Sequence, residues 1–232
     1  ANADAGYSHI YSLFAINGFV YFAKVFFKSN YKRDFLYASI FLGLIFILRH
    51  IIIVIILFIP FIAGSFTVLK NGFAIFKNIK YLVFSILIII GITSIQSYIW
   101  YLQTGNFLMY SYQGEGFNFL KPEIINILFS YQKGLFIYTP ILFLSLFGLI
   151  YLFYKRHYYL ATTWLLFFTI LNYVLSSWHC WTYGCSFGQR PYIDFYIVFF
   201  ILLGIIIFGI MNSCNIWSLA NRNFQTIHLW IL

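Results

Sequence analysis

A loop rich in aromatic rings, with two glycines and one arginine, stands out in an otherwise apolar chain. Residues Ser177–Arg190 read SWHCWTYGCSFGQR, and Arg190 directly precedes a proline at the expected start of a helix. Its guanidinium can hold an anionic group through two parallel hydrogen bonds, or it can form a structural ion pair with Asp194. Trp178 and Tyr183 are typical of an aromatic belt at a membrane surface, but a belt requires neither the glycines nor the arginine. The loop is therefore a candidate binding site.

A second polar stretch, from about residue 103 to residue 134, carries further candidates. Glu115 stands between two glycines, so the backbone can turn tightly and present its carboxylate. The segment Lys121–Phe129 (KPEIINILF) predicts a short helix in the membrane interface, with its proline at the first helical position. A packed loop helix is the alternative. Lys133 follows where the next apolar segment begins, and it can bind a phosphate or extend its ammonium to the lipid headgroups.

Three more polar residues lie at the edges of apolar segments. Arg49 and His50 interrupt an apolar run, and charges at such boundaries are costly and often functional. The alternative is a short turn in which Arg49 reaches the headgroups. His9, in the sequence GYSH, can be a base or a sugar contact, or it can be purely structural.

Metal and nucleotide chemistry have little support in the sequence. His179, Cys180 and Cys185 lie close together, but a second pair of ligands is missing, so no zinc site is predicted. A short disulfide between the two cysteines, or plain packing, is the alternative. The chain also lacks a phosphate-binding P-loop, a GxSxG elbow and an HExxH motif.

The composition defines the elements that must position these residues. Hydrophobic residues make up 62% of the 232 positions and charged residues only 8%, against about 25% in a soluble domain. A surface so poor in charge must be covered largely by lipid. We therefore predict an all-α, polytopic membrane bundle of about seven transmembrane helices, forming one domain over residues 1–232. The expected spans are Ile10–Phe27, Phe35–Leu48, Ile51–Leu69, Tyr81–Leu102, Leu135–Tyr154, Tyr159–Ser176 and Ile193–Met211.

The distribution of lysine and arginine predicts the orientation. Seven spans alternate the loops between two sides, and the short loops of one side collect most of the cations. That side should be cytoplasmic. The basic surplus of +9 is then a topology signal with some contact to membrane lipid, and no nucleic-acid partner is expected. The long polar loops and all the candidate residues above fall on the opposite, outer side.

At these residues the chain resembles the bacterial GT-C glycosyltransferases, relatives of the protein O-mannosyltransferases and the lipid A aminoarabinose transferases. Ser177–Arg190 is similar to their W-x-G-G-x-S-F-G-x-R loop. The stretches Tyr110–Phe119 and Leu128–Pro140 resemble the loop and helix that precede it. Ser8-His9 and Leu48-Arg49 match the family's order, the latter resembling an R-P-x-N corner. The resemblance implies a GT-C-like fold whose N-terminal helices and first outer loop are missing from residues 1–232.

Several departures bear on the site. The loop has Tyr183-Gly184-Cys185 in place of paired glycines and Gln189 in place of the usual proline. The corner lacks its proline and asparagine. No segment corresponds to the family's first outer loop, which carries the proposed acidic base. Asp4 and Glu115 are the acidic candidates that the chain itself offers.

The resemblance implies a reaction at the outer face of the bacterial cytoplasmic membrane. A sugar on a polyprenyl-phosphate carrier would be transferred to an acceptor hydroxyl of a glycan, lipid or protein. His9, Arg49, Lys133 and Arg190 would hold the phosphate and substrate, with Trp178 and Tyr183 stacking on sugar rings. No cofactor is required, although a divalent metal would be compatible with this chemistry. A transporter or flippase for a lipid-linked or anionic substrate, and a non-catalytic membrane subunit, are the alternative functions.

Overall fold

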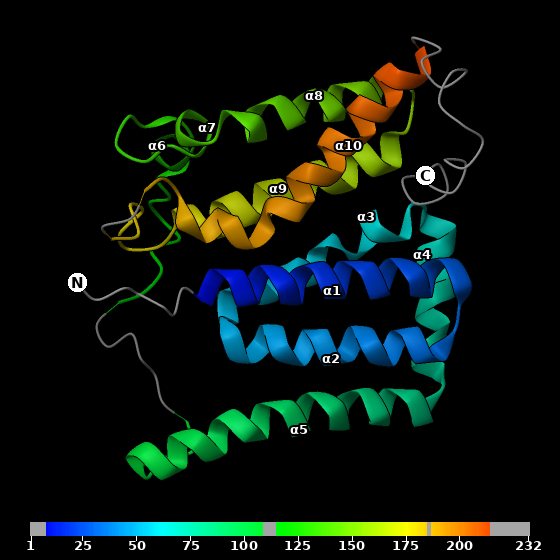
Figure 1. The fold of residues 1–232 in the computed structure, drawn as a ribbon, viewed down its shortest axis with the longest axis vertical. Coiled ribbons are helices and arrows are strands. Elements are labelled where there is room, and N and C mark those ends of the chain that lie inside the picture. The colour runs from blue at the N-terminus through cyan, green and yellow to red at the C-terminus, as the bar shows by residue number, and fades with distance from the viewer. Residues whose placement is uncertain (1–7, 109–114, 185–186, 214–232) are drawn as a thin grey trace.

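The computed structural model describes residues 8–108, 115–184 and 187–213, and these residues form helices and connecting loops (Figure 1). No strand occurs among them, only an isolated bridge between Phe117 and Trp178. The helices are α1 (Ser8–Ser29), α2 (Lys32–Leu48), η1 (His50–Phe58), α3 (Ile59–Ala63), α4 (Phe66–Gly72), η2 (Phe73–Lys77), α5 (Ile79–Thr104), α6 (Ile124–Phe129), α7 (Leu135–Tyr138), α8 (Pro140–Tyr154), α9 (Tyr158–Ser176), η3 (Arg190–Phe195) and α10 (Tyr196–Ser213), where η marks a 3₁₀ helix.

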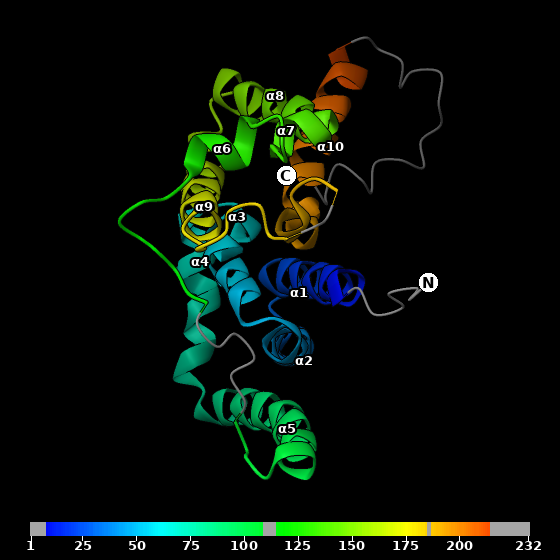
Figure 2. The same cartoon turned by 90° about the vertical axis from the view of Figure 1, so that its left-hand side faces the viewer.

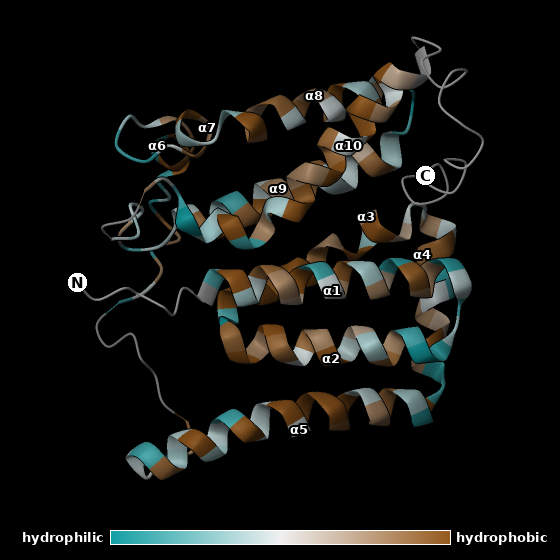
Figure 3. Ribbon diagram, in the orientation of Figure 1, coloured by the Kyte–Doolittle hydropathy of each residue, from teal (hydrophilic) through white to brown (hydrophobic). Residues whose placement is uncertain are grey.

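The long helices run side by side between two ends of the molecule (Figures 1 and 2). The start of α1, the segment after α5 and the loop between α9 and η3 lie at one end, here called the loop end. The α1–α2 turn, α4 and the α8–α9 turn lie at the other, here called the lysine end. Hydrophilic colour concentrates toward the helix ends and the loops, while hydrophobic residues dominate the middles of the helices (Figure 3). This arrangement is what a bilayer requires.

Four helical segments are long and apolar enough to cross a membrane: His9–Ser29, Ile79–Thr104, Tyr158–Ser176 and Arg190–Met211. A fifth crossing is added if the bent pair formed by His50–Ala63 and Phe66–Lys77 is one span. The chain is therefore a multi-pass helical membrane protein. The expected seven spans exceed this number because α2 has 17 residues and begins with charged side chains, and α8 has only 15 residues.

Two predicted spans are broken, and both breaks follow from local sequence. The span expected over Ile51–Leu69 is not one straight helix, since the chain bends by 119° after α3. Gly64 takes a φ of +83° there, and the Ser65 side chain accepts a hydrogen bond from the Val68 N–H to begin α4. The span expected over Leu135–Tyr154 is divided into α7 and α8, because Pro140 cannot donate a backbone hydrogen bond and instead begins a helix.

The predicted interfacial helix exists but is shorter than expected. It begins at Ile124, so the proline at 122 precedes it and does not occupy its first position. Ile127 and Leu128 are buried, while Ile125 is 75% exposed. Its apolar residues therefore face both the protein and the exterior, which is compatible with a position at the edge of a bilayer.

The core lies between α1, α9 and the η3–α10 segment. Trp164 on α9 is fully buried and donates its indole N–H to the Val198 carbonyl on α10 at 3.1 Å. On the other side, α10 packs so closely on α8 that a Cβ at Gly148 would lie 2.3 Å from the Leu202 carbonyl oxygen. The η3 segment that precedes α10 packs on α1, where Asp194 meets His9 in the first turn.

Candidate functional site

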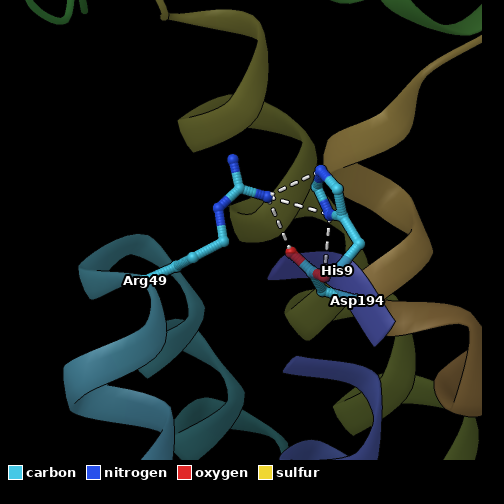
Figure 4. Close-up of polar contacts among 3 residues, drawn as sticks. All are labelled: His9, Arg49 and Asp194. Atoms are coloured by element: carbon cyan, nitrogen blue, oxygen red, sulfur yellow. Dashed lines mark hydrogen bonds and ion pairs between the residues drawn. The ribbon is translucent and has the colours of Figure 1, made fainter. Parts of the chain in front are cut away.

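A buried cluster of His9, Arg49 and Asp194 joins three distant parts of the chain at the loop end (Figure 4). Asp194 accepts hydrogen bonds through both carboxylate oxygens. His9 Nδ1 lies 2.9 Å from Oδ1, and Arg49 Nη1 lies 3.1 Å from Oδ2. The same Arg49 nitrogen lies 3.1 Å from His9 Nε2 and 2.9 Å from Nδ1. The three side chains therefore act as one unit.

Each residue of the cluster lies near the end of a helix or between two helices. His9 lies in the first turn of α1, and Asp194 lies in η3. Arg49 is the single residue between α2 and η1, and its extended backbone, with φ −157° and ψ 116°, separates the two helices. The carboxylate is 1% exposed and the arginine side chain 20% exposed, so the ion pair is largely shielded from water. Removing either charge would leave the other buried without compensation.

The roles of the two ring nitrogens of a neutral His9 depend on its tautomer. If Nδ1 carries the proton, it donates to Asp194, and the lone pair on Nε2 accepts from Arg49. A carboxylate that fixes an imidazole in this way is a common arrangement around bases and metal ligands. The remaining ring nitrogen is covered by Arg49, so His9 is 5% exposed. In this structure, both ring nitrogens of His9 are therefore occupied by Asp194 and Arg49.

Asp194 belongs with Arg49 and not with Arg190. The ion pair that the sequence suggested between Arg190 and Asp194 is not what the structure shows. Instead, Arg190 Nη2 donates to the Tyr183 carbonyl oxygen at 2.8 Å. The sequence indicates His9 and Arg49 as candidates, but it does not reveal Asp194 as the residue that joins them.

A second group at the loop end consists of two cations bound to successive carbonyl groups. Lys133 Nζ donates to the carbonyl oxygens of Thr182, at 2.9 Å, and of Gly184. Arg190 bonds the intervening carbonyl of Tyr183. Tyr183 and Gly184 both have left-handed backbones, with φ +51° and +77°, which give the turn its shape. Lys133 and Arg190 therefore hold the loop in one conformation, because charge-assisted hydrogen bonds are stronger than neutral ones.

Aromatic stacking and backbone pairing connect the two long loops. Trp178 and Tyr183 have nearly parallel rings with centroids 6.3 Å apart. Trp178 also meets the edge of Phe117 at 4.9 Å, next to a hydrogen bond from the His179 N–H to the Gly116 carbonyl at 2.9 Å. The stretch that contains Glu115 is thus tied directly to the loop that contains Tyr183.

The Tyr183 phenol is anchored to the end of α9. Its hydroxyl donates to the Leu175 carbonyl at 2.6 Å. Burial raises the pKa of Tyr183 well above its usual range, although the positive charge of Arg49 acts in the opposite direction. Arg49 is therefore close enough to influence this hydroxyl electrostatically, and Tyr183 remains a neutral hydrogen-bond donor at physiological pH.

The structure describes one of the two acidic candidates, Glu115. Asp4 lies outside the described residues. Glu115 has an exposed side chain and lies next to Gly116, whose carbonyl accepts the hydrogen bond from the His179 N–H. Within the described segments, no three His, Cys, Asp or Glu side chains are grouped to hold a metal ion.

Cys180 has a free thiol within the described part of the chain, and Cys185 lies outside it. The sulfur lies 3.1 Å from the Thr182 hydroxyl. That hydroxyl lowers the pKa of the Cys180 thiol, with burial opposing it. The thiolate is therefore more populated near neutral pH than in an ordinary cysteine, which makes Cys180 a useful chemical probe of this loop.

Gln189 is a polar residue that sequence reasoning noted only as a departure from the family pattern. Its side chain is 3% exposed, and its Nε2 donates to the Trp181 carbonyl at 3.3 Å. Its Oε1 is buried without a hydrogen-bond partner among the described residues. Such an atom costs about 1–3 kcal/mol. Gln189 Oε1 is therefore an unsatisfied hydrogen-bond acceptor within the loop.

Comparisons with protein-family models, curated proteins and solved structures find no match. The fold and the site define a multi-pass helical membrane protein with a bonded cluster of cations and aromatic residues at one end.

Proposed function

We propose that this chain is the C-terminal membrane portion of a GT-C-like glycosyltransferase that uses a polyprenyl-phosphate sugar at the outer face of the bacterial cytoplasmic membrane. One observation supports this most strongly. His9, Arg49, Lys133, Trp178, Tyr183 and Arg190 are dispersed along the sequence, yet they gather at one end of the helices. An enzyme acting on a membrane-bound donor needs such a group at the level of the headgroups.

In this proposal, all seven helical passes cross the bilayer. The segment from His50 to Ala63 is short for a crossing, but its 3₁₀ part covers more length per residue. A 3₁₀ helix rises about 2.0 Å per residue, whereas an α-helix rises about 1.5 Å. The nine residues of η1 and five of α3 then extend roughly 25 Å. The α4 segment that follows would lie near the lysine-rich surface.

The transfer step requires a new bond from the acceptor hydroxyl oxygen to the anomeric carbon. The bond from that carbon to the phosphate oxygen breaks, and polyprenyl phosphate leaves with the bonding electrons. The hydroxyl proton passes to an acidic base, which we place in the family's first outer loop, outside residues 1–232. In this proposal Arg49 and Lys133 stabilise the leaving phosphate, once their present partners, Asp194 and the loop carbonyls, are exchanged for the substrate.

Arg190 would act as a positioning residue. Its bond to the Tyr183 carbonyl holds the ring of Tyr183 parallel to that of Trp178. Two such rings at a membrane surface can pack against the apolar face of a sugar. Loss of Arg190 would release the loop, because the hydrogen bond seen for its side chain among the described residues goes to Tyr183.

Arg190→Ala in the complete protein is expected to lower sugar transfer by at least about 100-fold, as for other groups that organise a charge-stabilising site. Transfer is measured with a lipid-linked sugar donor in membranes that contain equal amounts of inserted protein. Lys121→Ala is the matched control, since it removes an exposed cation from the same end without any bond to residues 178–190. That variant should retain transfer.

Normal transfer by Arg190→Ala would remove Arg190 from the site. If the complete protein moves the lipid-linked sugar across the bilayer without transferring it to an acceptor, the protein is a transporter and the proposal is wrong.

A further inference from the structure

The lysine end contains a basic hollow that is unrelated to the groups described above. It has a volume of about 490 Å³ and is lined by Asn30, Tyr31, Lys32, Arg33 and Tyr81. Lys32 and Arg33 are exposed, and the Lys32 ammonium lies 5.0 Å above the Tyr81 ring. Residues 28–34 read KSNYKRD, so three cations stand against one acid. That acid, Asp34, is 3% exposed and accepts a hydrogen bond from the Ser29 hydroxyl.

A second, apolar cavity of about 300 Å³ lies deeper between α1, α2, α5 and the α3–η2 segment. Its walls are mostly apolar, and the Ser39 and Ser85 hydroxyls within them bond each other at 2.7 Å. Phe73 and Phe76 line it and are each 47% exposed, so its wall reaches the molecular surface. An apolar cavity of this kind excludes water and favours an apolar guest.

The hollow and the cavity follow the same two helix faces. On α2, Lys32 lines the hollow, and Phe35, Ser39 and Leu42 line the cavity, at helical spacings of three and four residues. On α5, Tyr81 lines the hollow, and Ser85 and Ile89 line the cavity, each four residues after the one before. The seam between α2 and α5 therefore leads from a basic surface into an apolar interior.

The dimensions of this seam match one membrane leaflet. From Lys32 to Leu42 the helix rises about 15 Å, which is half of the roughly 30 Å hydrocarbon thickness of a bilayer. An acyl chain would fill the cavity over that depth, and a phosphate would lie beside the two cations at its mouth. Basic sites between membrane helices on the cytoplasmic side commonly bind anionic lipid headgroups.

We propose that the α2–α5 seam binds one anionic phospholipid from the leaflet on the lysine side. Its phosphate contacts Lys32 and Arg33, and one acyl chain occupies the cavity beside Ser39 and Ser85. This site is independent of the proposed sugar transfer, because all the residues that define it lie away from the loop end (Figure 1).

The headgroup is tested by native mass spectrometry of the delipidated protein with phosphatidylglycerol or phosphatidylcholine of the same chains. Two cations should favour phosphatidylglycerol by about 25-fold, at roughly fivefold for each cation. Lys32→Gln with Arg33→Gln should abolish this preference. Lys70→Gln with Lys77→Gln, which removes two exposed cations outside the hollow, should leave it intact. Equal binding of both lipids, or equal losses in both double variants, would overturn the proposal.

The acyl chain is tested in the same assay. Ala38→Leu adds volume to the cavity wall and should weaken phosphatidylglycerol binding by at least about fivefold. If this variant does not fold, phosphatidylglycerol with six-carbon chains should bind the unmodified protein at least about tenfold more weakly than the long-chain lipid. Equal affinity for both chain lengths, or full competition by free glycerol phosphate, would show a site for soluble phosphate and overturn the proposal.

Discussion

Asp194→Asn is expected to destabilise the protein by about 3–5 kcal/mol, the cost of leaving a buried charge without its partner. The carboxylate is 1% exposed and holds both Arg49 and His9, so the neutral amide would leave the Arg49 charge uncompensated. The apparent free energy of unfolding in detergent measures the loss. The midpoint of thermal unfolding should fall by roughly 6–20 °C.

Asp34→Asn is the matched control. Asp34 is also a buried acid, but its cationic partner Arg33 is 72% exposed and lies 3.8 Å away. A pair of that kind contributes little, so the loss should stay below about 1 kcal/mol. Adding Arg49→Met to Asp194→Asn removes the orphaned charge and should restore most of the stability. If Asp194→Asn and Asp34→Asn are equally stable, the cluster does not hold the three segments together.

Gly148→Leu is expected to separate α8 from α10 and to cost at least about 3 kcal/mol. A side chain at 148 would meet the Leu202 carbonyl group, and a backbone atom cannot move aside as a flexible side chain can. Membrane helices approach this closely only where a small residue lies at the contact. The thermal midpoint of the purified protein measures the effect.

Gly204→Leu on α10 provides the comparison. A Cβ at Gly204 has no neighbour within 4 Å, so the same substitution meets open space. Its effect should lie within about 0.5 kcal/mol. Similar losses in the two variants would show that the close α8–α10 approach is not required.

The sequence predicts the ends of the long helices well because apolar length is a local property. Tyr81–Leu102 and Tyr159–Ser176 lie within α5 and α9 and differ from them by at most two residues at either end. The broken span at Gly64 was missed because hydropathy continues through it, although a glycine followed by serine is a recognisable end and cap.

The sequence identifies several residues of the candidate site, but it does not predict which groups they bond. A charge in an apolar run identifies Arg49, but nothing local indicates that its partner lies 145 residues away at Asp194. Lys133 and Arg190 were expected beside a phosphate, and the structure has them on carbonyl groups of the intervening loop. Cations satisfy either kind of acceptor, so residue type alone cannot distinguish these arrangements.

Cysteine labelling tests the central claim, that the loop end faces outward, most directly. Cys180 is kept as the single cysteine by changing Cys185 and Cys214 to serine, and its lowered pKa favours reaction near neutral pH. Tyr154→Cys in a cysteine-free background is the comparison, because Tyr154 is 78% exposed at the lysine end. A membrane-impermeant maleimide should label Cys180 in intact cells and Tyr154→Cys only in inside-out vesicles. Labelling of Cys180 only in inside-out vesicles would contradict the account.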